Sequence, residues 1–245
     1  MFCYMVYSHS TYSDCWIPHF GRLDRYCPFE FEAYMLLTDS FTVSTNCFFN
    51  IKNPVVAFYQ EDKAYCERIL FALENSVEQD FIFFCHEDMI LYDIPNTDYF
   101  SEFVNTIVED DAVDFIKLLK SGCSGNSYKG SKILQETSNS SKYNFSIQPT
   151  LWKKDRLIKF LKNNPGRSAC ELEEYCQSHF EDSTQLFSYD ITVDKQRGGM
   201  HTDSTTWPAM STAIRKGRWI TSEYGKELEN LFEEYGIDSS ERGVI

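Results

Sequence analysis

Two adjacent carboxylates, Glu87 and Asp88, follow the apolar run from Phe81 to Cys85 and are the residues best placed for chemistry. Such an unbroken apolar run is typical of a strand buried on both faces of a sheet. Open α/β sheets bind ligands beyond the carboxyl ends of their strands. Because hard cations such as Mg²⁺ and Mn²⁺ take oxygen ligands, the pair predicts a metal site for a nucleotide phosphate. We expect Asp88 to be the ligand and Glu87 its helper; a solvated acidic pair is the alternative.

A second candidate metal ligand is His201, in the glycine-containing loop 197–203. A neutral imidazole binds transition metals, so His201 could complete a coordination sphere begun by Asp88. His9, just past the first apolar run, and His86, beside the acidic pair, are alternatives. An exposed loop histidine with no ligand is the competing interpretation.

Three carboxylates, Glu171, Glu173 and Glu174, open a probable helix after a Pro-Gly turn. Carboxylates in a first turn complement the helix dipole, which is a sufficient structural reason for them. A general base that takes a proton from a hydroxyl is also often a carboxylate. Helical spacing puts Glu171 and Glu174 on one face and Glu173 elsewhere.

A nucleoside diphosphate that leaves a sugar develops negative charge, which a cation can stabilise. Arg68 lies on the helix before the apolar run, and four more candidates surround or follow the His201 loop: Arg197, Arg215, Lys216 and Arg218. Most of them would be ordinary surface charges. The chain has no P-loop, no G-x-G-x-x-G and no G-x-S-x-G sequence, which removes the usual signals of P-loop kinases, dinucleotide-binding folds and α/β-hydrolases.

Composition excludes several classes of protein. A net charge of −14 over 245 residues argues against a nucleic-acid partner, which would need a basic face. No apolar run approaches the roughly 20 residues of a membrane-spanning helix. The N-terminus lacks the features of a secretory signal, so we expect a cytoplasmic protein, in the host cytoplasm if the protein is viral. Nine scattered cysteines without zinc-type spacing fit reduced thiols.

The first half of the chain alternates short apolar runs with amphipathic ones, as in β-α-β units. The predicted strands there are 2–7, 31–38, 54–59 and 81–85, and the predicted helices are 11–26, with Ser13-Asp14 near its cap, and 62–73. The second half is less regular. There we expect helices at 98–109, 152–161, 170–180 and 223–235, strands at 114–119 and 144–149, and a long loop at 121–141.

These elements predict an α/β fold with a mostly parallel central sheet flanked by helices. We expect one domain over residues 1–222 and a short C-terminal helical appendage, 223–245, packed on it.

Five blocks in order resemble a known family: Phe81–Leu91, Phe145–Asp155, Cys170–Glu173, Ala213–Trp219 and Glu234–Asp238. Together they resemble GT-A-fold glycosyltransferases of bacterial surface-polysaccharide clusters and of large DNA viruses or phages. The likeness covers nearly the whole chain. It implies a Rossmann-like sheet, a nucleotide-sugar donor, most often UDP-linked, a glycan acceptor, and Mn²⁺ or Mg²⁺ as cofactor.

The resemblance also implies roles for individual residues. The acidic Asp-x-Asp-type motif of the family maps onto Glu87 and Asp88, with His86 where a first aspartate would stand. The Trp-Glu-x-Glu block maps onto Cys170, Glu171 and Glu173, with cysteine in place of the aromatic residue. Donor-base contacts follow strands one and two in similar folds, and here they would be Ser8, His9, Ser10 and Asp39.

The expected mechanism is a single displacement with inversion at the anomeric carbon. Glu171 or Glu173 would deprotonate the acceptor hydroxyl, while Asp88, through a metal, and a nearby Arg or Lys stabilise the diphosphate. Gln148 and Trp152 would shape the acceptor pocket. Two alternatives stay open: a glycoside hydrolase that uses paired carboxylates, and a catalytically inactive protein that binds a sugar or a nucleotide.

Overall fold

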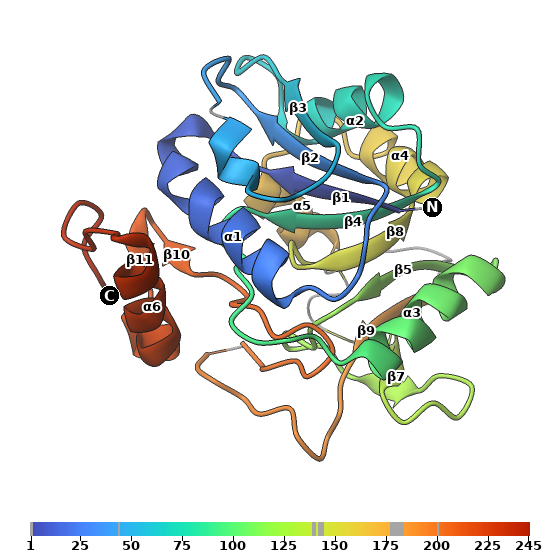
Figure 1. The fold of residues 1–245 in the computed structure, drawn as a ribbon. Helices are drawn as coiled ribbons and strands as arrows, with labels where there is room; N and C mark the ends of the chain where they lie inside the picture. The colour runs from blue at the N-terminus through green and yellow to red at the C-terminus, as the bar shows by residue number, and fades with distance from the viewer. Residues whose placement is uncertain (1, 44, 139–140, 142–144, 177–183, 200) are drawn as a thin grey trace.

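The computed structural model describes residues 2–43, 45–138, 141, 145–176, 184–199 and 201–245. A large mixed sheet runs through the middle of the molecule (Figure 1). Its described strands are β1 (Phe2–Tyr7), β2 (Ala33–Thr38), β3 (Pro54–Phe58), β4 (Phe81–His86), β5 (Val113–Lys117), β6 (Gly125–Ser127), β7 (Leu134–Thr137), β8 (Thr150–Lys153) and β9 (Thr184–Ser188). The described α-helices are α1 (Trp16–Tyr26), α2 (Tyr65–Asn75), α3 (Thr97–Glu109), α4 (Lys154–Lys162), α5 (Ala169–Cys176) and α6 (Thr221–Tyr235).

The strand order is β3-β2-β1-β4-β8-β5-β9-β7-β6. Strands β3, β2, β1 and β4 are parallel, so their carboxyl ends lie along one edge of the sheet. From β1 the chain moves outward to β2 and β3 and then returns to place β4 on the other side of β1. The point where the order reverses, between β1 and β4, is where sheets of this kind bind ligands. The expected α/β fold with a central sheet flanked by helices is confirmed, and the sheet is parallel from β3 to β4 and mixed beyond β4.

Helices cover both faces of the sheet because its central strands are apolar on both sides. In β1, Tyr4 and Val6 pack into the core beneath α1 and α3, while Cys3, Met5 and Tyr7 pack into the core beneath α2, α4 and α5. The alternation follows from the two-residue repeat of a strand. Both cores consist of buried side chains, and their packing holds the strands and the loops at the strand ends in position.

The second half departs from the sequence prediction in several places, and residues 177–180 of the expected helix 170–180 lie outside the described residues. Described residues 145–149 are not a strand; the strand is β8, Thr150–Lys153, and residue 144 lies outside the described residues. The helix expected from Trp152 begins at Lys154, because Trp152 lies in β8 and is buried against Phe115. The expected loop 121–141 contains the hairpin β6–β7, which extends the sheet beyond β9.

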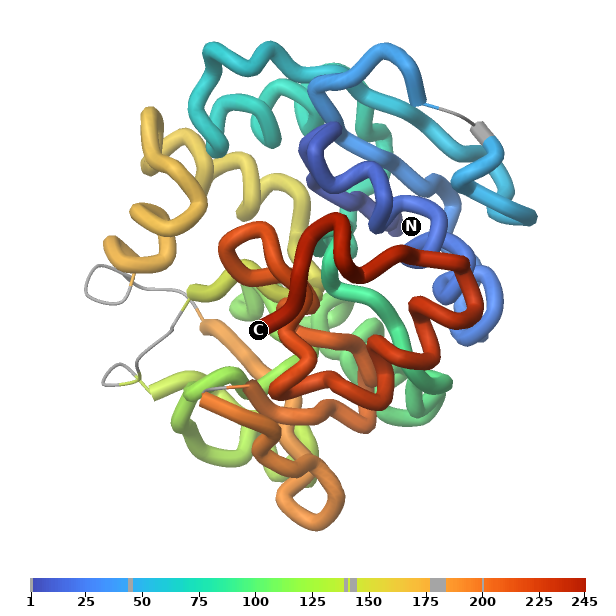
Figure 2. The backbone as a smooth tube through the Cα atoms, turned by 90° about the vertical axis from the view of Figure 1, so that its left-hand side faces the viewer, coloured from blue at the N-terminus to red at the C-terminus, as the bar shows by residue number. Residues whose placement is uncertain are grey.

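The C-terminal residues form a separate layer at one side of the sheet, shown in red in Figures 1 and 2. A 3₁₀ helix, Ser10–Cys15, follows β1, and Cys15 contributes to the same apolar cluster as Trp219, Tyr224 and Leu228. The short strands β10 (Ile214–Arg215) and β11 (Arg218–Trp219) pair next to this cluster. A second 3₁₀ helix, Thr45–Phe48, lies between β2 and β3. None of the helices that the structure describes is long and apolar enough to cross a membrane.

Candidate functional site

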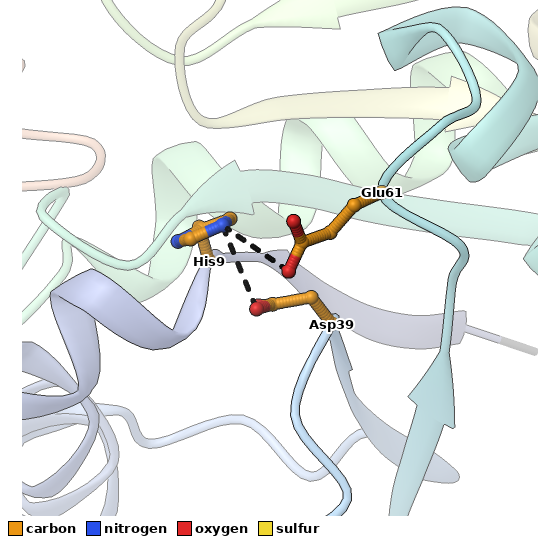
Figure 3. Close-up of side chains that lie close together, drawn as sticks. All are labelled: His9, Asp39 and Glu61. Atoms are coloured by element: carbon orange, nitrogen blue, oxygen red, sulfur yellow. Dashed lines mark ion pairs between the residues drawn. The ribbon is translucent and has the colours of Figure 1, made fainter.

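Three loops meet at the carboxyl edge of the sheet and bring His9, Asp39 and Glu61 together (Figure 3). They follow β1, β2 and β3. The His9 Nε2 atom lies 3.5 Å from Asp39 Oδ2 and 4.0 Å from Glu61 Oε1. Asp39 is held by Ser10, whose backbone N–H donates to Oδ1 at 2.6 Å and whose hydroxyl donates to Oδ2 at 2.7 Å. We call His9, Asp39 and Glu61 the loop cluster.

The hydrogen bonds of His9 decide what the loop cluster can bind. The Thr11 backbone N–H donates to His9 Nδ1 at 3.1 Å, which caps the 3₁₀ helix. Because Nδ1 accepts, the proton of the neutral ring is on Nε2, and Nε2 faces the two carboxylates. A protonated nitrogen cannot ligate a metal. In this geometry the loop cluster offers one donor and two carboxylate acceptors to a polar ligand, and a cation would bind there only after the Nε2 proton is removed.

Aromatic side chains pack next to the loop cluster. The rings of Tyr7 and Tyr59 stack 5.4 Å apart, and Tyr59 donates to the Ser8 carbonyl at 2.9 Å. Arg68, predicted as a donor contact, lies over the Tyr59 ring at 4.6 Å and donates to the Tyr7 hydroxyl at 2.9 Å. Two further bonds tie its guanidinium to the carbonyls of Glu61 and Lys63. Arg68 therefore braces the loop after β3.

A cavity of about 670 Å³ opens between the end of β3 and α2. Phe41 and Phe58 stack 4.5 Å apart on its wall, and Tyr59 and Arg68 line it as well. Since Phe41 is two residues from Asp39, the cavity adjoins the loop cluster.

The acidic pair lies at the end of β4 and is buried: Glu87 is 6% exposed and Asp88 is 8% exposed. The Ile214 backbone N–H donates to Asp88 Oδ2 at 3.1 Å. Glu87 Oε2 is buried and has no hydrogen-bond partner among the described residues. Burial raises the pKa of both carboxyl groups, and for Glu87 the neighbouring Asp88 raises it further. A buried carboxylate oxygen without a donor fits a cation, so Glu87 and Asp88 are the pair that suits Mg²⁺ or Mn²⁺.

A histidine that the sequence analysis did not single out supports this turn. His19, on α1, is buried; its Nδ1 lies 3.0 Å from the Glu87 carbonyl oxygen and its Nε2 lies 3.0 Å from the Tyr4 hydroxyl. Burial lowers the pKa of His19 to about 4. A neutral ring whose Nδ1–H donates to the carbonyl holds the backbone of Glu87 in place. In the sequence, His19 occurs on the apolar face of a helix, which gives no sign of this contact.

The structure separates the two carboxylates predicted as the base. Glu171 is exposed and caps its own helix: its Oε2 accepts from the Ser168 backbone N–H at 2.8 Å, which lowers its pKa. Glu173 is partly buried, and its Oε1 accepts from the Ile147 backbone N–H at 2.6 Å. Burial raises the pKa of Glu173, whereas the hydrogen bond from Ile147 and the charge of Lys117 lower it. Of the two carboxylates, Glu173 is the less exposed.

Among the described residues, His201 and Asp88 do not belong to a common group of three metal-type ligands. Within the described residues, the loop cluster is the one set of three or more metal-type ligands whose atoms all lie within 4.8 Å of one another. The His201 Nδ1 atom bonds to the carboxylate of Glu223, which also pairs with Arg215 at 3.3 Å. Arg197 pairs with Asp203 at 2.5 Å and with Glu227 at 2.6 Å. Both arginines thus have carboxylate partners away from the acidic pair.

Arg242 is a cation that the sequence analysis missed. Its Nε and Nη2 atoms bond to Asp14, and Nη2 also donates to the Thr11 carbonyl at 2.6 Å. Asp14, expected near a helix cap, instead anchors this arginine. The charge of Arg242 lowers the pKa of Glu87 and of Asp88, against the effect of burial. No local pattern marks Arg242, because 228 positions separate it from Asp14.

No protein-family model and no curated protein sequence matches the chain. Similar solved structures include S. aureus TarS 1–349, with a TM-score of 0.53, 13% identity, and coverage of 98% of this chain and 68% of that one. A cytidylyltransferase from Leptospira borgpetersenii serovar Hardjo-bovis (strain JB197) has a TM-score of 0.50 and 12% identity, and covers 97% of this chain and 96% of its own. At these identities the likeness concerns the fold, and the chain has a GT-A-like Rossmann fold.

Proposed function

We propose that this protein is a glycosyltransferase that moves a sugar from a nucleotide-sugar donor to a hydroxyl group of a glycan acceptor. One observation carries the proposal. The loop cluster and the buried acidic pair lie along the same edge of the sheet, on either side of the β1–β4 reversal. A nucleotide sugar has the matching parts, a polar base at one end and a diphosphate that links the nucleoside to the sugar.

The loop cluster suits the base of the donor. The Asp39 carboxylate accepts hydrogen bonds, and the protonated Nε2 of His9 donates one. Uracil presents an N–H between two carbonyl oxygens, so it offers one donor and two acceptors to such a pair. This complementarity favours a UDP-linked donor, with Ser8 and Ser10 holding the loop after β1.

The acidic pair would hold Mn²⁺ or Mg²⁺ through Glu87 and Asp88. When bound, the cation supplies positive charge to the diphosphate as it leaves the sugar. Asp88 is held by the Ile214 N–H, and Glu87 by the contact of its carbonyl with His19. The Asp88 carboxylate and the backbone of Glu87 are therefore held in place before any ligand arrives.

Glu173 is the base in this proposal. It accepts the proton of the acceptor hydroxyl as that oxygen forms a bond to the anomeric carbon. The bond from the anomeric carbon to the diphosphate oxygen breaks at the same time, and the diphosphate departs with the electron pair. A single displacement of this kind inverts the configuration at the anomeric carbon. Glu171, which caps its helix, has a structural role instead.

Nucleotidyl transfer from a triphosphate is less well supported, although a cytidylyltransferase shares the fold. A triphosphate needs several cations or a glycine-rich run of backbone N–H groups. Residues 8–15, which follow β1, include no lysine, arginine or glycine. A glycoside hydrolase is disfavoured too, because Glu87 and Asp88 are neighbours on one turn and cannot flank a scissile bond.

A screen of nucleotide sugars by isothermal titration calorimetry, with and without Mn²⁺, tests the proposal. We expect a UDP-sugar to bind, Mn²⁺ to tighten binding, and the purified protein to release UDP slowly from that donor. NMR of the product anomer would then establish inversion. Turnover of CTP to pyrophosphate, or no binding of any nucleotide sugar, would contradict the proposal.

A further inference from the structure

The C-terminal segment brings one guanidinium to the loop that follows β1. Arg242 bonds to Asp14 and to the Thr11 carbonyl, and its guanidinium lies 4.7 Å from the centre of the Tyr12 ring. Its side chain is 14% exposed. Figure 2 shows the red C-terminal segment and the blue N-terminal segment on the same side of the molecule. Arg242 therefore covers the first loop of the candidate donor site.

Backbone pairing ties this segment to the acidic pair. The Trp219 N–H donates to the Gly243 carbonyl at 3.1 Å, and the Ile245 N–H donates back to Trp219 at 2.8 Å. Trp219 pairs with Ile214 across the β10–β11 hairpin, and the Ile214 N–H donates to Asp88. A continuous set of hydrogen bonds thus links the strand that holds Asp88 with Gly243 and Ile245, which follow Arg242.

A diphosphate at this place meets an excess of negative charge from Glu87, Asp88 and Asp14. A cation must offset that charge, and the described arginines differ in where they lie. Arg68 is bonded beneath the loop after β3, and Arg215 pairs with Glu223. Arg242 instead lies at the loop that follows β1, where it bonds to Asp14 and to the Thr11 carbonyl. Its Nη1 atom makes no hydrogen bond to a described residue, whereas Nε and Nη2 do.

We propose that Arg242 binds the diphosphate of the donor, with Asp14 holding the guanidinium ready before the donor arrives. The two N–H groups of Nη1 remain available, and a hydrogen bond from a guanidinium to a phosphate oxygen is charge-assisted and therefore strong. The free Nη1 atom makes the first contact, and the bonds to Asp14 keep the remaining N–H groups in position. This inference rests on the proposed function, and it adds the C-terminal segment to the donor site.

The test compares two probes, uridine and uridine 5′-diphosphate, by calorimetry in the presence of Mn²⁺. In Arg242→Gln we expect the Kd for UDP to rise by about tenfold to a hundredfold, the range for a hydrogen bond to a charged group. The Kd for uridine should stay unchanged, because uridine has no phosphate. An equal change for both probes, or no change for UDP, would overturn the inference.

A second variant separates a direct contact from a structural effect. Asp14→Asn weakens the anchor of the same segment but leaves the guanidinium, so the Kd for UDP should rise less than it does in Arg242→Gln. If Asp14→Asn loses as much UDP affinity as Arg242→Gln, the contact only anchors the tail and the inference is wrong. If the wild-type protein binds neither probe, the proposed UDP-linked function itself fails, which is a different result.

Discussion

Two acidic groups share one edge of the sheet, and they differ in their hydrogen bonds and in the direction of their pKa shifts. In the loop cluster, the Asp39 side chain is 5% exposed and accepts three hydrogen bonds from Ser10 and Thr38. In the acidic pair, Glu87 Oε2 is buried without a donor among the described residues. The hydrogen bonds around Asp39 lower its pKa, whereas burial raises that of Glu87.

The difference shows how the same side chain can prepare for different ligands. A carboxylate that is already ionised and well bonded is ready to accept a hydrogen bond from an uncharged group. A buried carboxylate without donors is costly until a cation neutralises it. We therefore expect the loop cluster to contribute to donor affinity and the acidic pair to contribute to turnover.

Asp88→Asn should have the largest effect. Sugar transfer should fall on the order of a hundredfold to a thousandfold, because the variant removes a charge that acts on the departing diphosphate. Asparagine keeps the volume and an acceptor for the Ile214 N–H, so the melting temperature should be retained. Turnover of the donor found in the nucleotide-sugar screen is the measurement. Near-wild-type turnover would contradict the expectation that the acidic pair, unlike the loop cluster, contributes to turnover.

His19→Gln should change how the free energy of unfolding depends on pH, because His19 is buried against the Glu87 carbonyl. The pKa of His19 is lowered from 6.5 to about 4, so the unfolded chain binds a proton below pH 6.5 that the folded chain does not. As the pH falls from 6.5 to 4, the wild type should lose about 3 kcal/mol of stability relative to the glutamine variant.

Denaturant unfolding of both proteins at pH 7.5 and at pH 4.5 measures this difference. A free-energy gap that does not change between the two pH values would mean that His19 is not held neutral by burial.

Asp39→Asn should have a smaller effect, and of a different kind. Replacement of the charged acceptor should raise the KM for the donor roughly tenfold, with kcat little changed, because the contact is the same in the ground state and the transition state. Steady-state kinetics with the identified donor separate the two constants. A fall in kcat at constant KM would assign Asp39 to the chemical step and contradict the comparison.

Glu61→Gln should have the smallest effect. The Glu61 side chain is 68% exposed and its carboxylate is 4.0 Å from His9, which makes the ion pair weak. The KM for the donor should change by less than about threefold. A change as large as that of Asp39→Asn would place Glu61 in direct contact with the base.

Much of the first half of the fold could be predicted from the sequence. The strand Phe2–Tyr7 matches its prediction, and Phe81–His86 extends its prediction by one residue. Long apolar runs and helical periodicity signal these elements without help from distant residues. In the second half, β8 was expected several residues too early, and β6 and β7 were not expected. Short strands that pair across long distances have a weak local pattern, since their partners define them.

By itself, the sequence determined the two-sided apolar strand that ends in Glu87 and Asp88, and the loops that follow β1 and β2, because local pattern suffices for both. Only the tertiary structure decided that Glu173 is partly buried while Glu171 caps a helix, that His201 pairs with Glu223, and that Arg242 lies next to Asp14. These outcomes depend on burial and on partners far away in the chain. Their free energies arise from contacts that form only when the sheet and its helices have packed.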